Sequence, residues 1–109
     1  MNQNDVVVVI ATLEAADGKE SQVEEALRTA VRAVHAEPGC ERYALHRASS
    51  SPTTFVMVEK WASGQALRVH GKGPALAELG KTLDGLLAKP MDLQILTPLP
   101  DGDPQLGAL

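Results

Sequence analysis

The chain has 109 residues and a mass of 11.5 kDa, which leaves room for one domain. Hydrophobic residues make up 44% and charged residues 22% of the sequence, values of a globular protein that exclude a wholly disordered or fibrous chain. The net charge of −4 argues against a nucleic-acid partner, because a phosphate backbone attracts basic proteins.

Neither a membrane anchor nor a disulfide framework is visible in the sequence. The longest apolar run, residues 6–11, is far shorter than the roughly 20 residues that span a bilayer, and no Lys or Arg precedes it as in a signal peptide. Cys40 is the single cysteine, so one chain can form neither an internal disulfide nor a thiolate metal cage. We therefore expect a cytoplasmic protein without a membrane partner.

The first predicted element is a strand over residues 5–13, a nearly continuous apolar run rich in β-branched side chains. An apolar stripe at helical spacing follows and predicts a helix. Ser21 and Glu24 fit a capping box at its start, although Lys19 or Glu20 is an alternative first residue. The stripe consists of Val23, Leu27, Ala30, Val31 and Val34.

Pro38-Gly39 ends this helix, and two strands follow over residues 40–48 and 54–61. Only a short turn at residues 49–53 separates them, which predicts a hairpin. Alternation places Tyr43, Leu45 and Arg47 on one face of the first strand, and Phe55, Met57, Glu59 and Trp61 on one face of the second.

Two more helices are predicted after the hairpin. The first covers residues 63–70, with Ser63 as its cap and Gly71 and Gly73 at its end. Pro74 suits the first turn of the second helix, whose stripe of leucines extends to Lys89-Pro90. The stripe consists of Leu76, Leu79, Leu83, Leu86 and Leu87.

A last strand is predicted over residues 91–96, where apolar and polar residues alternate. The rest of the chain is rich in proline and glycine, a composition that resists both helix and strand. We therefore divide the chain into a domain at residues 1–97 and a C-terminal arm at residues 98–109 that is extended or partly disordered.

This order of elements predicts an α+β, ferredoxin-like split βαβ fold with a four-stranded antiparallel sheet. The first and third strands carry apolar residues on both faces and belong in the middle of the sheet. Because the helices can cover only one face, the other would expose an apolar patch larger than monomers tolerate. We therefore expect a homodimer that packs sheet against sheet.

All three aromatic residues, Tyr43, Phe55 and Trp61, lie on the predicted hairpin, and Glu59 lies between two of them. In one interpretation Trp61 packs against the short helix and Glu59 pairs with Arg68 or Arg42. In the other these residues line a cavity, where desolvation raises the pKa of the carboxyl. The sequence alone does not decide between the two interpretations.

The histidines show no metal-ligand spacing, so we expect no metal site. His35 suits a helix C-terminus, where an imidazolium is favourable, and His46 is expected to be solvated or at an interface. His70 follows Trp61 by nine residues and precedes a glycine-rich loop. It is either a helix cap or the base of a pocket.

Two stretches resemble the antibiotic biosynthesis monooxygenase domain family, which includes quinol monooxygenases. They are Glu37-Pro38-Gly39-Cys40 followed by Tyr43, and residues 55–67 followed by His70. The resemblance covers roughly residues 5–97 and implies a dimeric α+β barrel with a pocket between sheet and helices. The best-known members oxygenate phenols, anthrones or quinols without flavin, haem or metal, so no cofactor is expected. Gly80 stands where haem-degrading relatives have their axial histidine, which disfavours that activity.

The resemblance implies a cofactor-free monooxygenase for a small phenolic, quinol or polyketide-like substrate. In this hypothesis His70 accepts a substrate proton and Glu59 orients or acidifies it. Trp61 and Phe55 offer apolar surface to the substrate, and Tyr43 or Thr12 binds its oxygen. The alternatives are a non-catalytic dimer that binds a small hydrophobic metabolite, and a module that interacts through its sheet face.

Overall fold

The computed structural model describes residues 5–109, so the first four residues of the predicted domain lie outside the described part of the chain. Four strands and three helices follow one another in the order expected for a split βαβ fold. They are β1 (Val7–Glu14), α1 (Glu20–Val34), β2 (Cys40–Arg47), β3 (Thr54–Trp61), α2 (Gly64–Gly71), α3 (Pro74–Leu83) and β4 (Asp92–Leu96).

The four strands form one antiparallel sheet in the order β2-β3-β1-β4. The prediction that the first and third strands are central is confirmed. Residues directly across the sheet from one another fix the register: Val9 pairs with Glu59 on β3 and with Ile95 on β4, and Tyr43 on β2 also pairs with Glu59.

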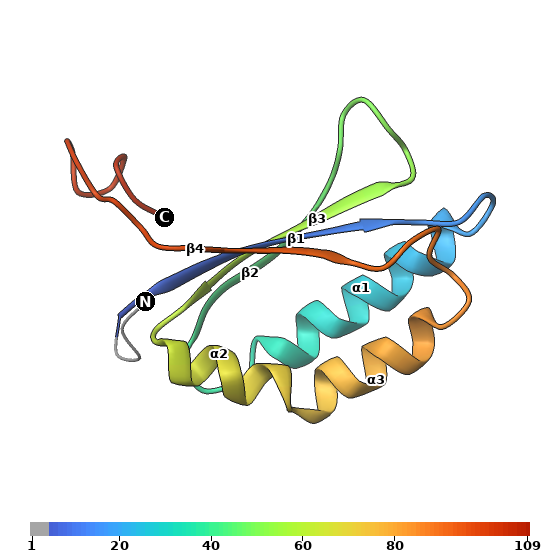
Figure 1. The fold of residues 1–109 in the computed structure, drawn as a ribbon, viewed down its shortest axis with the longest axis horizontal. Helices are drawn as coiled ribbons and strands as arrows, with labels where there is room; N and C mark the ends of the chain where they lie inside the picture. The colour runs from blue at the N-terminus through green and yellow to red at the C-terminus, as the bar shows by residue number, and fades with distance from the viewer. Residues whose placement is uncertain (1–4) are drawn as a thin grey trace.

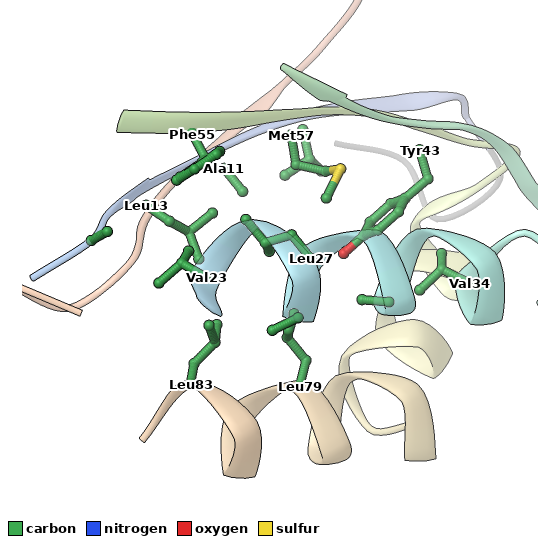
Figure 2. Packing of buried hydrophobic residues seen from close by; sticks show 14 of the residues in the cluster. Ala11, Leu13, Val23, Leu27, Val34, Tyr43, Phe55, Met57, Leu79 and Leu83 are labelled. Atoms are coloured by element: carbon green, nitrogen blue, oxygen red, sulfur yellow. The ribbon is translucent and has the colours of Figure 1, made fainter. Parts of the chain in front are cut away.

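All three helices lie on one side of the sheet, and the other side carries no helix (Figure 1). The core fills the space between these two layers. In Figure 2 Phe55, Met57 and Tyr43 extend from the strands toward α1, and Leu79 and Leu83 extend from α3 toward α1. The Tyr43 hydroxyl points toward α1.

The structure decides between the alternatives for one helix boundary and corrects another. α1 begins at Glu20 with Lys19 at its N-cap and has no side-chain cap, so Ser21 and Glu24 form no capping box. The alternative start at Glu20 is confirmed. α3 ends at Leu83, not near Lys89, because the backbone leaves the helical region at Asp84 and Gly85 has a φ of +78°.

The leucine stripe continues past the end of α3 because the next leucines pack from a turn. Leu86 and Leu87 are partly buried against the core, and Leu87 forms an isolated bridge with Ala15. The start of α2 follows the prediction, since the Ser63 side chain accepts a hydrogen bond from the Ala66 amide at 3.1 Å.

β4 and the C-terminal arm are the most exposed part of the described chain. All five residues of β4 are exposed, including Leu93, Ile95 and Leu96. The arm contains no helix or strand, and Lys60 donates a hydrogen bond to the carbonyl of Leu109 at 2.7 Å. No helix among residues 5–109 has the length and apolar character needed to cross a membrane.

Candidate functional site

A cavity of about 210 Å³ lies between the helix-facing side of the sheet and helices α2 and α3. Its wall is almost entirely apolar, and the few polar side chains that reach it are Tyr43, Glu59 and His70. A mostly apolar cavity with a few converging polar groups is typical of a binding site for a small organic molecule. The other lining residues are Val9, Ala11, Leu13, Leu27, Met57, Leu67, Gly71, Leu76, Leu79, Met91, Leu93 and Ile95.

The strand register brings two of the polar residues together. Tyr43 and Glu59 are directly opposite each other on β2 and β3, so their side chains project from the same face as neighbours. Met57, Glu59 and Trp61 share one face of β3, as predicted, and the structure shows that this is the helix-facing side, where all three are buried. Glu59 is 4% exposed, which makes it one of the two buried polar or charged residues of the described chain.

His70 is the other buried polar residue and enters the cavity from α2. Its Nδ1 lies 2.8 Å from Oε1 of Glu37, which stands in the turn between α1 and β2. Hydrogen bonding to this carboxylate places the proton of a neutral imidazole on Nδ1 and leaves Nε2 with a free lone pair. Nε2 makes no hydrogen bond within residues 5–109 and is not fully enclosed by protein atoms. Because His70 lines the cavity, Nε2 opens onto it.

A glycine allows the Glu37 turn to approach α2 this closely. Gly39 has a φ of +81°, and a Cβ there would lie 2.5 Å from the Cβ of Ala66. The Gly39 carbonyl also accepts a hydrogen bond from the Ala62 amide at 2.8 Å. The turn that carries Glu37 is therefore fixed against the start of α2, four to eight residues before His70.

Trp61 lies behind the polar residues and does not line the cavity. It is 0% exposed, its Nε1 donates a hydrogen bond to Oε1 of Glu59 at 3.0 Å, and its ring centroid is 4.5 Å from that of His70. The Trp61 side chain thus orients both the Glu59 carboxyl group and the His70 imidazole. The predicted pairing of Glu59 with Arg68 or Arg42 is wrong, because the indole is its hydrogen-bond partner.

The surroundings favour the neutral forms of Glu59 and Tyr43. Burial raises the pKa of Glu59, and the Trp61 hydrogen bond and the nearby His70 oppose this only in part. Burial, together with the charges of Glu59 and Glu37, raises the pKa of the Tyr43 hydroxyl far above its ordinary value. Tyr43 is therefore a hydroxyl donor at any physiological pH.

Besides Trp61, two other residues proposed to bind substrate do not line this cavity. Thr12 lies on β1 between Ala11 and Leu13, and strand alternation turns it to the opposite face of the sheet. Phe55 is 1% exposed and borders a different hollow between α1 and β2, where Arg47 lies over its ring at 5.2 Å. The cavity therefore brings together Tyr43, Glu59 and His70 of the predicted set.

The sequence interpretation missed the role of Glu37 and the contribution of β4. No local spacing links Glu37 to His70, which lie 33 residues apart, although Glu37 is part of a stretch that carries the family resemblance. Met91, Leu93 and Ile95 form one wall of the cavity, and the alternation of apolar and polar residues in this segment was the visible signal.

The other two histidines have structural contacts: His35 Nε2 lies 3.0 Å from the carbonyl of Tyr43, and His46 Nδ1 lies 3.1 Å from that of Ala44.

Within residues 5–109, no group of three or more His, Cys, Asp or Glu side chains is arranged to hold a metal ion. The chemistry that the cavity residues themselves can perform is proton transfer. The cavity offers an imidazole nitrogen that accepts a proton, a carboxyl group and a tyrosine hydroxyl, in a space lined mainly by apolar side chains.

A family model described as antibiotic biosynthesis monooxygenase matches residues 6–81 of the chain. No curated protein matches the sequence. Among solved structures, PA3566 from Pseudomonas aeruginosa is 28% identical, with a TM-score of 0.82 and coverage of 91% of this chain and 99% of that one.

Two further solved structures are each 25% identical to this chain. Rv0793 from Mycobacterium tuberculosis has a TM-score of 0.83, with 91% of this chain and 100% of that one covered. A protein named as a candidate antibiotic biosynthesis monooxygenase from Caulobacter crescentus has a TM-score of 0.81, with 87% and 91% covered. The fold around the cavity is thus shared along nearly the full length of these proteins.

Proposed function

Because the chain belongs to the antibiotic biosynthesis monooxygenase family, we propose that its cavity oxidises a small phenol, quinol or polyketide-like substrate with molecular oxygen. The observation that carries this proposal is the hydrogen bond between Glu37 and His70, which leaves His70 Nε2 free at the cavity. A histidine held in this way is an effective general base.

In this mechanism His70 Nε2 removes the hydroxyl proton of the substrate, and Glu37 stabilises the imidazolium that forms. The electron-rich phenolate then transfers an electron to oxygen, and the two radicals combine to a peroxide at a ring carbon. Loss of water from the peroxide at a ring carbon that carries hydrogen gives a quinone from a phenol and a hydroxyquinone from a quinol. One oxygen atom ends in the product and the other in water, so the substrate supplies all the electrons.

The other polar side chains support the substrate. The Tyr43 hydroxyl, which stays protonated, donates a hydrogen bond to the substrate oxygen. Trp61 acts as a positioning residue, because it contacts His70 and Glu59 and not the cavity itself. The proposed binding surface is the aliphatic wall of the cavity, in place of Thr12 and Phe55.

We further propose that two copies pair through the helix-free face of the sheet. A row of half-buried apolar side chains crosses the middle of this face, with Ile10, Val58 and Ala44 directly adjacent on three strands. Contact with a second copy would remove these apolar side chains from water, which lowers the free energy of the dimer relative to two monomers. The cytoplasmic location stays a prediction from the sequence.

Oxygen uptake by the metal-free protein tests the proposed activity. We expect the protein to accelerate oxygen consumption with a naphthol, which should form the quinone, or with a menadiol-type quinol, which should form the hydroxyquinone. His70→Ala should lower kcat by about 100-fold or more, because general bases contribute factors of this size. His46→Ala serves as the control, because this histidine is exposed and lies on the opposite face of β2 from Tyr43, away from the cavity lining.

Two results would contradict this proposal. Oxygen uptake that His70→Ala leaves unchanged would exclude the histidine as the base. Tight binding of a naphthol without any oxygen uptake would instead favour the alternative function, a protein that binds a small hydrophobic metabolite without converting it.

A further inference from the structure

The polar end of the cavity holds two proton carriers that are oriented by different partners. Glu37 binds His70 through Nδ1, and Trp61 binds Glu59 through Oε1. Each residue therefore has one fixed atom and one remaining atom, which is Nε2 of His70 and Oε2 of Glu59.

The remaining oxygen of Glu59 opens onto the cavity. It makes no hydrogen bond within residues 5–109. In this part of the chain, two side-chain oxygens are fully enclosed and lack a hydrogen-bond partner, namely Oε2 of Glu20 and Oε2 of Glu37. Because Oε2 of Glu59 is not among these enclosed atoms and Glu59 lines the cavity, this oxygen faces the open space.

The indole determines which oxygen of a protonated Glu59 carries the proton. The carbonyl oxygen of a carboxylic acid is a stronger hydrogen-bond acceptor than its hydroxyl oxygen. Oε1, which accepts from Trp61, is therefore the carbonyl oxygen, and the carboxyl proton sits on Oε2. Burial raises the pKa of Glu59 and so increases the share of this protonated form. The cavity then contains a proton donor, Oε2, and a proton acceptor, Nε2.

We propose that this pair interconverts a neutral, enolisable ketone and its enol in the absence of oxygen, a second activity of the same cavity. Nε2 of His70 takes a proton from the carbon next to the carbonyl, and Oε2 of Glu59 gives its proton to the carbonyl oxygen. One C–H bond breaks and one O–H bond forms, and no electrons leave the substrate. Reversal of these steps, after exchange with solvent, returns both residues to their starting forms.

The cavity selects the class of ketone. Its wall is aliphatic apart from the polar end, and it holds about 210 Å³, which suits a compact apolar molecule with a single carbonyl. The Tyr43 hydroxyl supplies a second hydrogen bond to the carbonyl oxygen. An anionic substrate is disfavoured, because Glu37 and Glu59 are the acidic groups nearest to this end.

This activity uses the site of the proposed oxygenase but not its oxygen chemistry, so the two can be tested separately. The test follows deuterium incorporation into 2-tetralone, an aryl-fused ketone, by proton NMR in deuterated buffer under nitrogen. We expect the wild-type protein to exchange the protons next to the carbonyl faster than buffer alone. His70→Ala and Glu59→Gln should each slow this exchange by about 100-fold or more.

The pH profile separates proton positioning from a purely structural role of Trp61. The groups near Glu59 are His70 from α2, Glu37 from the α1–β2 turn, and Tyr43 and Cys40 from β2. The indole N–H stabilises the Glu59 carboxylate, so its loss in Trp61→Phe should raise the Glu59 pKa further. The decline of the exchange rate at high pH should therefore move to higher pH in this variant.

Val69→Ala, at an exposed position of α2 that does not line the cavity, is the control, and its pH profile should match that of the wild type. Exchange at the rate of buffer alone would overturn the inference, as would a Glu59→Gln rate within twofold of the wild type. An unmoved decline in folded Trp61→Phe would overturn the assignment of the proton to Oε2. If the protein exchanges the ketone protons but takes up no oxygen with a naphthol in air, only the proposed oxygenase is contradicted. If it takes up oxygen but does not exchange the ketone protons, only this inference is contradicted.

Discussion

Burial of Glu59 supplies a proton donor to the proposed site but lowers the free energy of unfolding at neutral pH. It is 4% exposed, its partner is a neutral indole, and burial raises its pKa. A carboxyl group whose pKa is raised by folding binds its proton more tightly in the native state. The free energy of unfolding therefore falls as the pH rises from the ordinary pKa of glutamate through the raised value.

We expect Glu59→Gln to be more stable than the wild type at pH 7, with a smaller difference at pH 4. The amide keeps the size of the side chain and an oxygen for the Trp61 N–H, but has no charge to desolvate. A difference of about 1 kcal/mol corresponds to roughly 4–8 °C in the Tm of a domain of this size, so calorimetry at both pH values is sufficient. Glu78→Gln, at an exposed position of α3, should change the Tm little at either pH. A Glu59→Gln protein less stable than the wild type at pH 7 would contradict the expectation.

At the scale of elements, the turn between α1 and β2 positions His70. Gly39 combines a positive φ with a close approach to Ala66, and both are needed to bring Glu37 against α2. An L side chain in this backbone conformation costs about 1–2 kcal/mol, and crowding in a packed region adds about 1–3 kcal/mol.

Gly39→Ala should therefore lower the free energy of unfolding by about 2–5 kcal/mol in urea titrations. Gly18→Ala is a matched control, because Gly18 has a φ of +76° but no atom within 4 Å of the added Cβ. It should cost only about 1–2 kcal/mol. Equal losses in the two variants would show that the contact with Ala66 is not tight.

The elements also show what local patterns can predict. The alternation from Phe55 to Trp61 identified the buried face of β3, because a strand has only two faces. The leucine stripe overestimated α3, because Leu86 and Leu87 bury their side chains from a turn that has the same apolar composition. The spacing of apolar residues in a sequence indicates which residues are buried, but buried residues can also follow the end of a helix.

The candidate site was predictable only in part, for a related reason. His70 and Glu59 were identifiable as titratable residues next to apolar ones, but their partners depend on tertiary contacts. Trp61 was expected to contact a substrate and instead supports Glu59 and His70 from behind. Glu37 comes from a turn 33 residues away from His70, and no local rule connects such residues.

For the whole molecule, the proposed dimer depends on the helix-free face of the sheet. Val58 lies at the centre of this face, between Ile10 and Ala44. We expect the wild-type protein to sediment as a dimer at micromolar concentration and Val58→Lys to sediment as a monomer, because the variant would bury an unpaired charge. Val69→Lys replaces an exposed valine on α2 and should leave the dimer intact. A monomeric wild type, or a dimer in both variants, would exclude pairing through this face.

Two of the strands that line the cavity, β1 and β4, differ in how many of their residues are buried. β1 is buried between two neighbours in the sheet, whereas β4 pairs on one side only and every one of its residues is exposed. Edge strands with few buried contacts open at low free-energy cost. An apolar guest can therefore enter and leave past Leu93 and Ile95 while Glu59 and His70 keep their positions, so exchange of guests need not disturb the groups that move protons.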